Sequence, residues 1–174
     1  MNIKKAVILV SGGMDSAVTM AIAKEQGFVC HALSVSYGQR HGAELDAANE
    51  LAKLQGAAEH KTVVVDLRSI GGSALTSDIA VPESASEGIP ITYVPARNTI
   101  MLSIALGWAE VLGANDIFCG INAVDYSGYP DCRPEFYEAF EKTIEKGTKP
   151  DTNIKIKTPI IELSKAEIVK KGLE

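Results

Sequence analysis

Residues 6–16 read AVILVSGGMDS, and this stretch decides the fold. Five apolar residues are followed by a serine, two glycines and a helix-forming sequence, so the order is strand, loop, helix. Backbone N–H groups at the start of such a helix meet the loop at the positive end of the helix dipole, and this geometry binds phosphate. The loop lacks the lysine of GxxxxGK(S/T) and the spacing of GxGxxG. A simple turn without a ligand is the alternative.

Length, charge and cysteine content favour one cytoplasmic domain. A chain of 174 residues can bury a substantial core, so we expect residues 1–174 to form a single domain. The net charge of -5 argues against a nucleic-acid partner. Cys30, Cys119 and Cys132 lack CxxC spacing, which is typical of a reducing cytosol. The apolar run near the N-terminus is too short for a signal peptide or a membrane span, so no membrane partner is expected.

Apolar segments alternate with helical patterns along the chain. This alternation predicts an α/β fold with a doubly wound, mostly parallel sheet and helices on both faces. Trp108, in the most apolar helix, is expected in the core. Residues 71–90 predict a mobile loop, with a solvated spacer as the alternative. Strands are expected at 6–10, 29–35, 62–65, 116–120 and 154–156, and helices at 15–26, 43–55, 98–112, 134–146 and after a capping box at Ser164.

Polar residues gather where the predicted strands end. Ligands of open α/β sheets bind at the carboxyl ends of the strands, so the four clusters 11–16, 34–41, 93–98 and 120–135 are expected to share one edge. Each cluster has a plainer interpretation. These are a surface position for His41, a helix N-cap at Asn98, a turn-rich loop over 125–133, and an inert thiol rather than an activated nucleophile at Cys132.

Several motifs carry a resemblance to a known family. The loop SGGMDS at 11–16 is similar to the SGGxDS pyrophosphate loop of the N-type ATP pyrophosphatases, or PP-loop superfamily. Within that superfamily, SYGQRH at 36–41, YVPARN at 93–98 and VDYSGYPDCRPEF at 124–136 resemble the 7-cyano-7-deazaguanine synthase family of queuosine biosynthesis. The late segments KTPI at 157–160 and LSKAEI at 163–168 resemble this family too. The resemblance covers essentially the whole chain. It implies a PP-loop ATP-binding domain with an adenine nucleotide alpha hydrolase-like, Rossmann-like fold.

The resemblance implies an ATP-dependent carbon–nitrogen ligase. Its substrates would be 7-carboxy-7-deazaguanine and ammonia, with ATP and Mg²⁺. Transfer of AMP to the carboxylate oxygen would create a leaving group and expel pyrophosphate into the loop at 11–16. Ammonia would then give an amide, and a second activation would give the nitrile. The resemblance also implies a homodimer.

The same resemblance implies roles for individual residues. Asp15, Ser16 and Arg97 are the expected catalytic residues. The nucleotide is expected to meet Val10, Ser11, Gly12, Gly13, Met14, Asp15, Ser16, Ala17, Val18, Thr19 and Met20, together with Ser34 and Tyr37. The substrate is expected to meet Gln39, Arg40, His41, Asn98, Asp125, Tyr126, Asp131, Arg133 and Glu135. Carboxylates would accept hydrogen bonds from the deazaguanine ring, and Arg97 or Arg133 would neutralise a carboxylate or phosphate.

The sequence departs from the family pattern in its cysteines. Members of the family carry a tail with four closely spaced cysteines that bind zinc. The three cysteines of this chain do not form such a group, so we expect no metal ligands among these residues.

One alternative is another adenylating enzyme of the superfamily, such as a tRNA thiolase or an amidotransferase synthetase. The other is a non-catalytic nucleotide-binding module.

Overall fold

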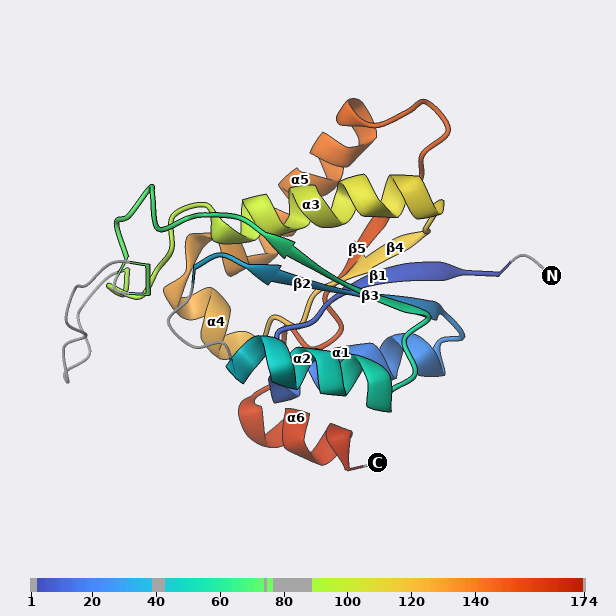
Figure 1. Cartoon of the computed structure of the whole chain (residues 1–174), viewed down its shortest axis with the longest axis horizontal. Coiled ribbons are helices and arrows are strands. Elements are labelled where there is room, and N and C mark those ends of the chain that lie inside the picture. Colours follow the sequence, from blue (N-terminus) through green and yellow to red (C-terminus); the bar gives the residue numbers. More distant parts are fainter. Residues whose placement is uncertain (1–2, 39–42, 74, 77–88, 174) are drawn as a thin grey trace.

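Strand β1 (Lys5–Leu9) runs through a short loop into helix α1 (Met14–Glu25), as the opening sequence predicts. The computed structural model describes residues 3–38, 43–73, 75–76 and 89–173 (Figure 1). Gly12 has φ +83°, a conformation that a residue with a side chain rarely adopts. Gly13, the N-cap of α1, has extended backbone angles and no side-chain cap. The loop therefore turns sharply at Gly12 and enters the helix at Gly13.

The described strands form one parallel sheet in the order β3-β2-β1-β4-β5. The central strand β1 pairs with β2 on one side and β4 on the other, and Val7 lies opposite both His31 and Ile117. The other strands are β2 (Val29–Ser36), β3 (Glu59–Val64), β4 (Asp116–Phe118) and β5 (Lys155–Lys157). This order confirms the doubly wound α/β prediction.

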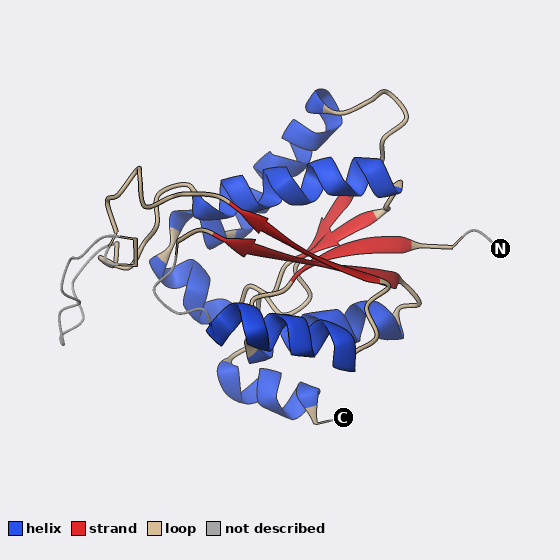
Figure 2. Ribbon diagram, viewed as in Figure 1, coloured by secondary structure: helices blue, strands red, loops and turns tan. Residues whose placement is uncertain are grey.

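Helices cover both faces of the sheet (Figure 2). On one face, α1 and α2 (Ala43–Leu54) pack on Ala6 and Ile8 of β1. On the other face, α3 (Arg97–Leu112) and α5 (Pro134–Gly147) pack on Val7. Successive residues of β1 thus enter different cores, because side chains alternate along a strand. Residues 6–10 are all apolar because both faces of the sheet are buried at β1.

Helix α6 (Lys165–Gly172) forms a further layer on the outer side of α1. Val18 and Ile22 of α1 pack there with Ile160 and Ile168. The predicted capping box at Ser164 is confirmed: its hydroxyl accepts a hydrogen bond from the Glu167 N–H, and Glu167 accepts one from the Ser164 N–H at 2.8 Å. This packing brings the start of α6 close to the start of α1.

The structure differs from the sequence-based expectations at several points. Two short elements lie where a turn-rich loop was the plainer interpretation: α4 (Ala123–Gly128) and the 3-10 turn η1 (Pro130–Cys132). Strand β3 begins at Glu59, three residues earlier than predicted. The N-cap interpretation of Asn98 is wrong, because α3 begins at Arg97. Trp108 is buried in the core, as predicted.

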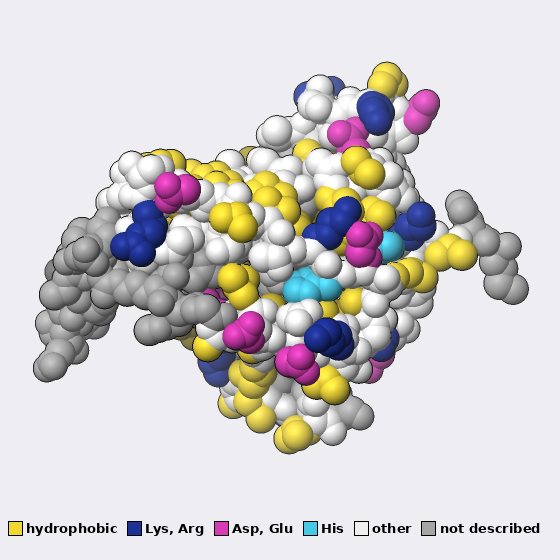
Figure 3. Space-filling view, viewed as in Figure 1, with side chains coloured by type: hydrophobic (Ala, Val, Ile, Leu, Met, Phe, Trp, Pro, Cys, Tyr) yellow, Lys and Arg dark blue, Asp and Glu magenta, His cyan; other side chains and the backbone are white. Residues whose placement is uncertain are grey.

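Three further expectations concern the mobile loop, the membrane and nucleic acids. Most of the predicted mobile loop falls on 74 and 77–88, outside the described residues. Among the helices that the structure describes, none is long and apolar enough to cross a membrane. On the face in Figure 3, Lys and Arg side chains lie interspersed with Asp and Glu, without a continuous basic patch.

Candidate active site

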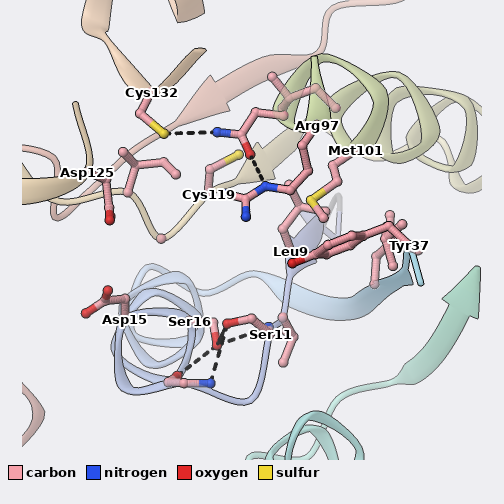
Figure 4. Close-up of a pocket in the computed structure, with 18 of the residues that line it drawn as sticks. Leu9, Ser11, Asp15, Ser16, Tyr37, Arg97, Met101, Cys119, Asp125 and Cys132 are labelled. Atoms are coloured by element: carbon pink, nitrogen blue, oxygen red, sulfur yellow. Dashed lines mark hydrogen bonds between the residues drawn. The ribbon is translucent and has the colours of Figure 1, made fainter. Parts of the chain in front are cut away.

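A pocket of about 350 Å³ lies at the carboxyl ends of β1, β2 and β4 (Figure 4). The chain passes from β1 to β2 on one side and reaches β4 on the other side of β1, so the pocket lies at the topological switch point. Nine of the predicted site residues line it: Val10, Ser11, Gly13, Asp15, Ser16, Tyr37, Arg97, Asn98 and Asp125. The structure therefore brings together residues from all four polar clusters of the sequence.

The loop before α1 is held in shape by its own hydroxyl groups. The Ser16 hydroxyl donates to the Gly13 carbonyl at 2.8 Å, and the Ser11 N–H donates to Ser16 Oγ at 3.3 Å. The Gly13 N–H in turn donates to Ser11 Oγ at 3.4 Å. These bonds wrap the loop around the first turn of α1, where the helix dipole is positive. This arrangement can hold an anion at the part of the pocket that Ser11, Gly13 and Ser16 line.

Two glycines permit close backbone packing around this loop. A Cβ on Gly12 would lie 2.7 Å from the Ala48 nitrogen and 2.7 Å from the Glu44 oxygen, both in α2. A Cβ on Gly120 would lie 2.9 Å from the Asp15 carbonyl oxygen. Gly12 thus faces α2 and is absent from the pocket lining, whereas Gly13 lines it. Gly12 therefore allows the loop to pack closely on α2, whereas Gly13 lies at the surface of the pocket.

Asp15 is anchored through one oxygen only. Its Oδ2 accepts hydrogen bonds from Asn122 Nδ2 at 2.9 Å and from Lys165 Nζ at 2.5 Å. Its Oδ1 is buried and has no hydrogen-bond partner among the described residues. A buried carboxylate oxygen without a partner is costly unless a ligand completes it. Because carboxylate oxygens and phosphates are the ligands that Mg²⁺ prefers, Oδ1 suits a magnesium ion shared with a bound nucleotide.

Arg97 presents a fixed positive charge to the pocket. Its guanidinium lies over the Tyr37 ring, 5.8 Å from the ring centroid. Burial acts to lower the pKa of Arg97, but Tyr37, Cys132 and Asp131 together raise it above its usual value. The preceding residue, Ala96, has φ +55°, a strained conformation for alanine. The Tyr37 ring and Asn98, whose Oδ1 accepts a hydrogen bond from Arg97 Nε at 3.4 Å, hold the guanidinium in place.

A buried hydrogen-bond group joins α3 to η1. The Asn98 N–H donates to Asp131 Oδ2 at 3.0 Å, so a carboxylate from a distant segment caps the start of α3. The Asn98 side chain donates to the Asp131 carbonyl at 3.0 Å and contacts Cys132 Sγ at 3.1 Å. Burial raises the pKa of Cys132 to about 12, which favours the inert thiol over the activated nucleophile.

A family model described as "Queuosine biosynthesis protein QueC" matches residues 5–174. The chain belongs to the QueC family. A 7-cyano-7-deazaguanine synthase of Stenotrophomonas maltophilia (strain R551-3) is 68% identical over 173 residues, covering 98% of this chain and 78% of its own length. The synthase of Xanthomonas campestris pv. campestris (strain B100) is 65% identical, covering 98% of this chain and 77% of its own length.

Solved structures at low sequence identity share the fold of this QueC-family chain. A predicted subunit of a tRNA methyltransferase from Methanocaldococcus jannaschii has a TM-score of 0.65 at 18% identity, over 99% of this chain and 75% of that chain. A 4-thiouridine synthetase, solved with RNA and bound ATP, has a TM-score of 0.57 at 21% identity, over 98% of this chain and 40% of that chain. These likenesses show a common α/β architecture.

Ten other predicted site residues, all within the described part of the chain, do not line the pocket. Ser34 is buried and donates to the Val10 carbonyl at 2.8 Å. Asp131 is engaged with Asn98, as described above. Gly12, Met14, Ala17, Val18, Thr19, Met20, Ser34, Asp131, Arg133 and Glu135 are absent from the lining. Gln39, Arg40 and His41, and the side chain of Tyr126, lie outside the described part of the chain. The functional roles of all these residues stay predictions.

Several residues in or beside the pocket were not among the predicted site residues. Lys165 reaches Asp15 across 150 positions of the chain, and only the docking of α6 on α1 reveals it. Glu44 and Leu45 enter the lining from the start of α2, and Tyr137 from the buried side of α5. Asn122 had a local signal, because Asn122 and Asp125 have capping-box spacing. Within the described residues, no three His, Cys, Asp or Glu side chains form a group that could hold a metal ion.

Proposed function

We propose that this QueC-family chain is a 7-cyano-7-deazaguanine synthase, an ATP-dependent ligase that converts 7-carboxy-7-deazaguanine and ammonia into the nitrile. The pocket supports this proposal through one observation above all. A lysine-free phosphate loop and a half-buried arginine, Arg97, line the same cavity at the switch point of the sheet. Such a site suits two anions at once, a nucleotide phosphate chain and a second acid. The relatives at 64–68% identity over nearly the whole chain carry the synthase name.

ATP activates the carboxylate in this proposal. The carboxylate oxygen attacks the α-phosphorus, the α–β phosphate bond breaks, and pyrophosphate leaves into the loop at 11–16. Backbone N–H groups at the start of α1 and the Ser11 hydroxyl neutralise the departing charge. Asp15 would hold Mg²⁺ through Oδ1, while Asn122 and Lys165 fix its other oxygen. The protein supplies positioning and charge stabilisation rather than a covalent intermediate.

Arg97 and Asp125 are the proposed contacts of the deazaguanine. Arg97 is preferred over Arg133 for the substrate carboxylate because Arg133 is exposed at the start of α5 and does not line the pocket. Asp125 lines the pocket and can accept hydrogen bonds from ring N–H groups. Ammonia displaces AMP to give the amide. A second ATP then adenylates the amide oxygen, and loss of two protons and AMP leaves the carbon–nitrogen triple bond.

One assay tests the proposal. The full chain is incubated with ATP, Mg²⁺, ammonium chloride and 7-carboxy-7-deazaguanine, and products are followed by mass spectrometry and nucleotide chromatography. We expect the nitrile together with AMP and pyrophosphate. ADP and phosphate as the primary products would exclude AMP transfer. ATP binding without turnover would favour a non-catalytic module, and AMP formation with another acceptor would favour a different adenylating enzyme of the superfamily.

The homodimer is a separate proposal and rests on the family resemblance alone. Size-exclusion chromatography with light scattering measures it directly. A mass near twice the 18.5 kDa of the chain is expected, and a mass of one chain at working concentration would contradict it.

A further inference from the structure

Asn122 lies behind the active-site pocket and contacts two of the carboxylates that line it. Asp15 and Asp125 line the pocket, whereas Asn122 is absent from the lining and fully buried. Both carboxylates lie on the same side of the cavity in Figure 4. Asn122 Nδ2 donates to Asp15 Oδ2 at 2.9 Å, and the Asn122 backbone N–H donates to Asp125 Oδ2 at 3.1 Å. One buried residue is therefore bonded to both carboxylates.

The hydrogen bonds of the Asn122 side chain fix the orientation of its amide. Its Oδ1 accepts hydrogen bonds from the Val124 N–H at 2.8 Å and from the Asp125 N–H at 3.4 Å, at the start of α4. Reversal of the amide would set its NH2 group against these two donors and its oxygen against the Asp15 carboxylate. Such unpaired groups are costly at a fully buried position. The nitrogen is thus directed at Asp15 and the oxygen at α4.

The segment that carries Asn122 is also joined to the start of α6. The Ala123 N–H donates to the Leu163 carbonyl at 3.3 Å, two residues before Lys165. Lys165 in turn donates to Asp15 Oδ2 at 2.5 Å. The two donors to Asp15 Oδ2 therefore come from segments that are bonded to each other. This arrangement fixes the carboxylate while its buried Oδ1 has no partner among the described residues.

We infer that Asn122 is a positioning residue for both ligands of the site, with a separate task for each end of its amide. Its nitrogen holds Asp15 so that the free carboxylate oxygen meets the magnesium ion of the nucleotide. Its oxygen holds the start of α4, and with it the Asp125 carboxylate that accepts from the deazaguanine ring. The identity of the two ligands rests on the proposed function.

Asn122→Ser and Asn122→Ala separate the two tasks. Serine caps a helix as well as asparagine does, but its side chain is too short to replace Nδ2 at Asp15. In Asn122→Ser, the Kd of α,β-methylene-ATP with Mg²⁺ should rise roughly tenfold, and that of 7-carboxy-7-deazaguanine should stay within about twofold. Alanine loses the cap as well, so in Asn122→Ala the second Kd should also rise, roughly threefold to tenfold. Isothermal titration calorimetry measures both Kd values without turnover.

A double-variant cycle tests whether Asn122 acts through Asp15. In an Asp15→Ala chain, Asn122→Ser should change the Kd of the ATP analogue by less than about twofold, because the contact that it removes is already absent. Asn115→Ser is the matched control. It makes the same substitution at an exposed position before β4 and should leave both Kd values unchanged.

Three outcomes would overturn the inference. One is an unchanged Kd of the ATP analogue in Asn122→Ser, and another is an equal rise of both Kd values in that variant. The third is an effect of Asn122→Ser that persists in the Asp15→Ala chain, which would indicate a general loss of structure. Failure of the wild type to bind 7-carboxy-7-deazaguanine would instead reject the proposed function, while the titrations with the ATP analogue would still test the contact with Asp15.

Discussion

Replacement of Gly12 by alanine tests how the phosphate loop is seated. Gly12 has φ +83°, and an added Cβ would lie 2.7 Å from two backbone atoms of α2 and 2.8 Å from the Ala47 Cβ. Backbone atoms cannot move aside as a flexible side chain can. The loop or α2 must therefore shift, and Ser11 and Ser16 would lose their present alignment at the pocket.

The expected loss of unfolding free energy in Gly12→Ala is the sum of two separate effects. A left-handed conformation disfavours alanine by about 1–2 kcal/mol. Overpacking against a rigid neighbour adds about 1–3 kcal/mol. The variant Gly12→Ala should therefore lose roughly 2–5 kcal/mol of unfolding free energy, and its Tm should fall by roughly 5–15 °C for a chain of this size. The displaced loop should also raise the KM for ATP by roughly tenfold or more.

Gly13→Ala is the matched control. Its backbone has φ -84° and ψ 166°, which alanine adopts without strain, and an added Cβ meets only Ser11 Oγ at 3.5 Å. We expect its Tm to lie within about 2 °C of wild type, since an unstrained substitution changes stability by about 0.5 kcal/mol or less. Thermal unfolding by circular dichroism and ATP titration measure both variants. Equal Tm values for the two alanine variants would refute the argument that α2 requires glycine at position 12.

Three further predictions follow from the site and the core. Lys165→Ala should raise the KM for ATP about tenfold, because Asp15 loses a charge-assisted bond, while the half-exposed pair contributes about 1 kcal/mol or less to stability. Asp131→Ala should destabilise the chain by about 1–3 kcal/mol and lower turnover, because the Asn98 N–H loses its side-chain acceptor, as urea unfolding and kinetics would measure. Burial lowers the pKa of His31 below 6.5, so the unfolded chain binds more protons and stability should fall as pH drops below that value.

Each of these predictions has a control. Lys170→Ala removes an exposed lysine from the same helix and should leave ATP kinetics unchanged; a similar loss in both variants would indicate damage to α6. Asp131→Asn keeps a side-chain oxygen that can accept from the Asn98 N–H, so it should lose less stability than the alanine variant; stability that stays at the wild-type level in Asp131→Ala would remove the capping argument. His31→Leu should flatten the pH dependence of urea unfolding between about pH 5 and 7. A slope unchanged in that variant would assign the effect elsewhere, with His60 as the next candidate because its pKa is also lowered.

Local patterns predicted the central part of the fold well. The apolar run before Ser11 and the helix after it are strong signals, because both faces of β1 are buried and the turn needs glycine. Edge strand β3 was harder: its first residues, Glu59, His60 and Lys61, are polar, since little of the sheet edge is buried. Helix α4 carries too few apolar residues for a periodic signal, and only its capping box at Asn122 marked it.

The same difference between local and long-range information decides which site residues could be predicted from the sequence. Residues close to a strand end in sequence, such as Ser16 and Asp125, could be placed at the pocket from the rule that ligands bind at the carboxyl ends of strands. A motif alone could not tell which of its members face inward. Within one contiguous run Asp125 lines the pocket, Asp131 caps α3, and Glu135 is exposed on α5. Lys165 depends on how two helices pack, which no local pattern records.

The contact between Asp15 and Lys165 spans 150 residues, and this separation has a consequence for synthesis of the chain. The ribosome synthesises the phosphate loop first and adds the lysine 150 residues later. A nascent chain that has already formed β1 and α1 therefore holds Asp15 without its ammonium partner, and the ion pair closes only when α6 reaches the outer side of α1. Formation of this pair accordingly reports the docking of α6 on α1.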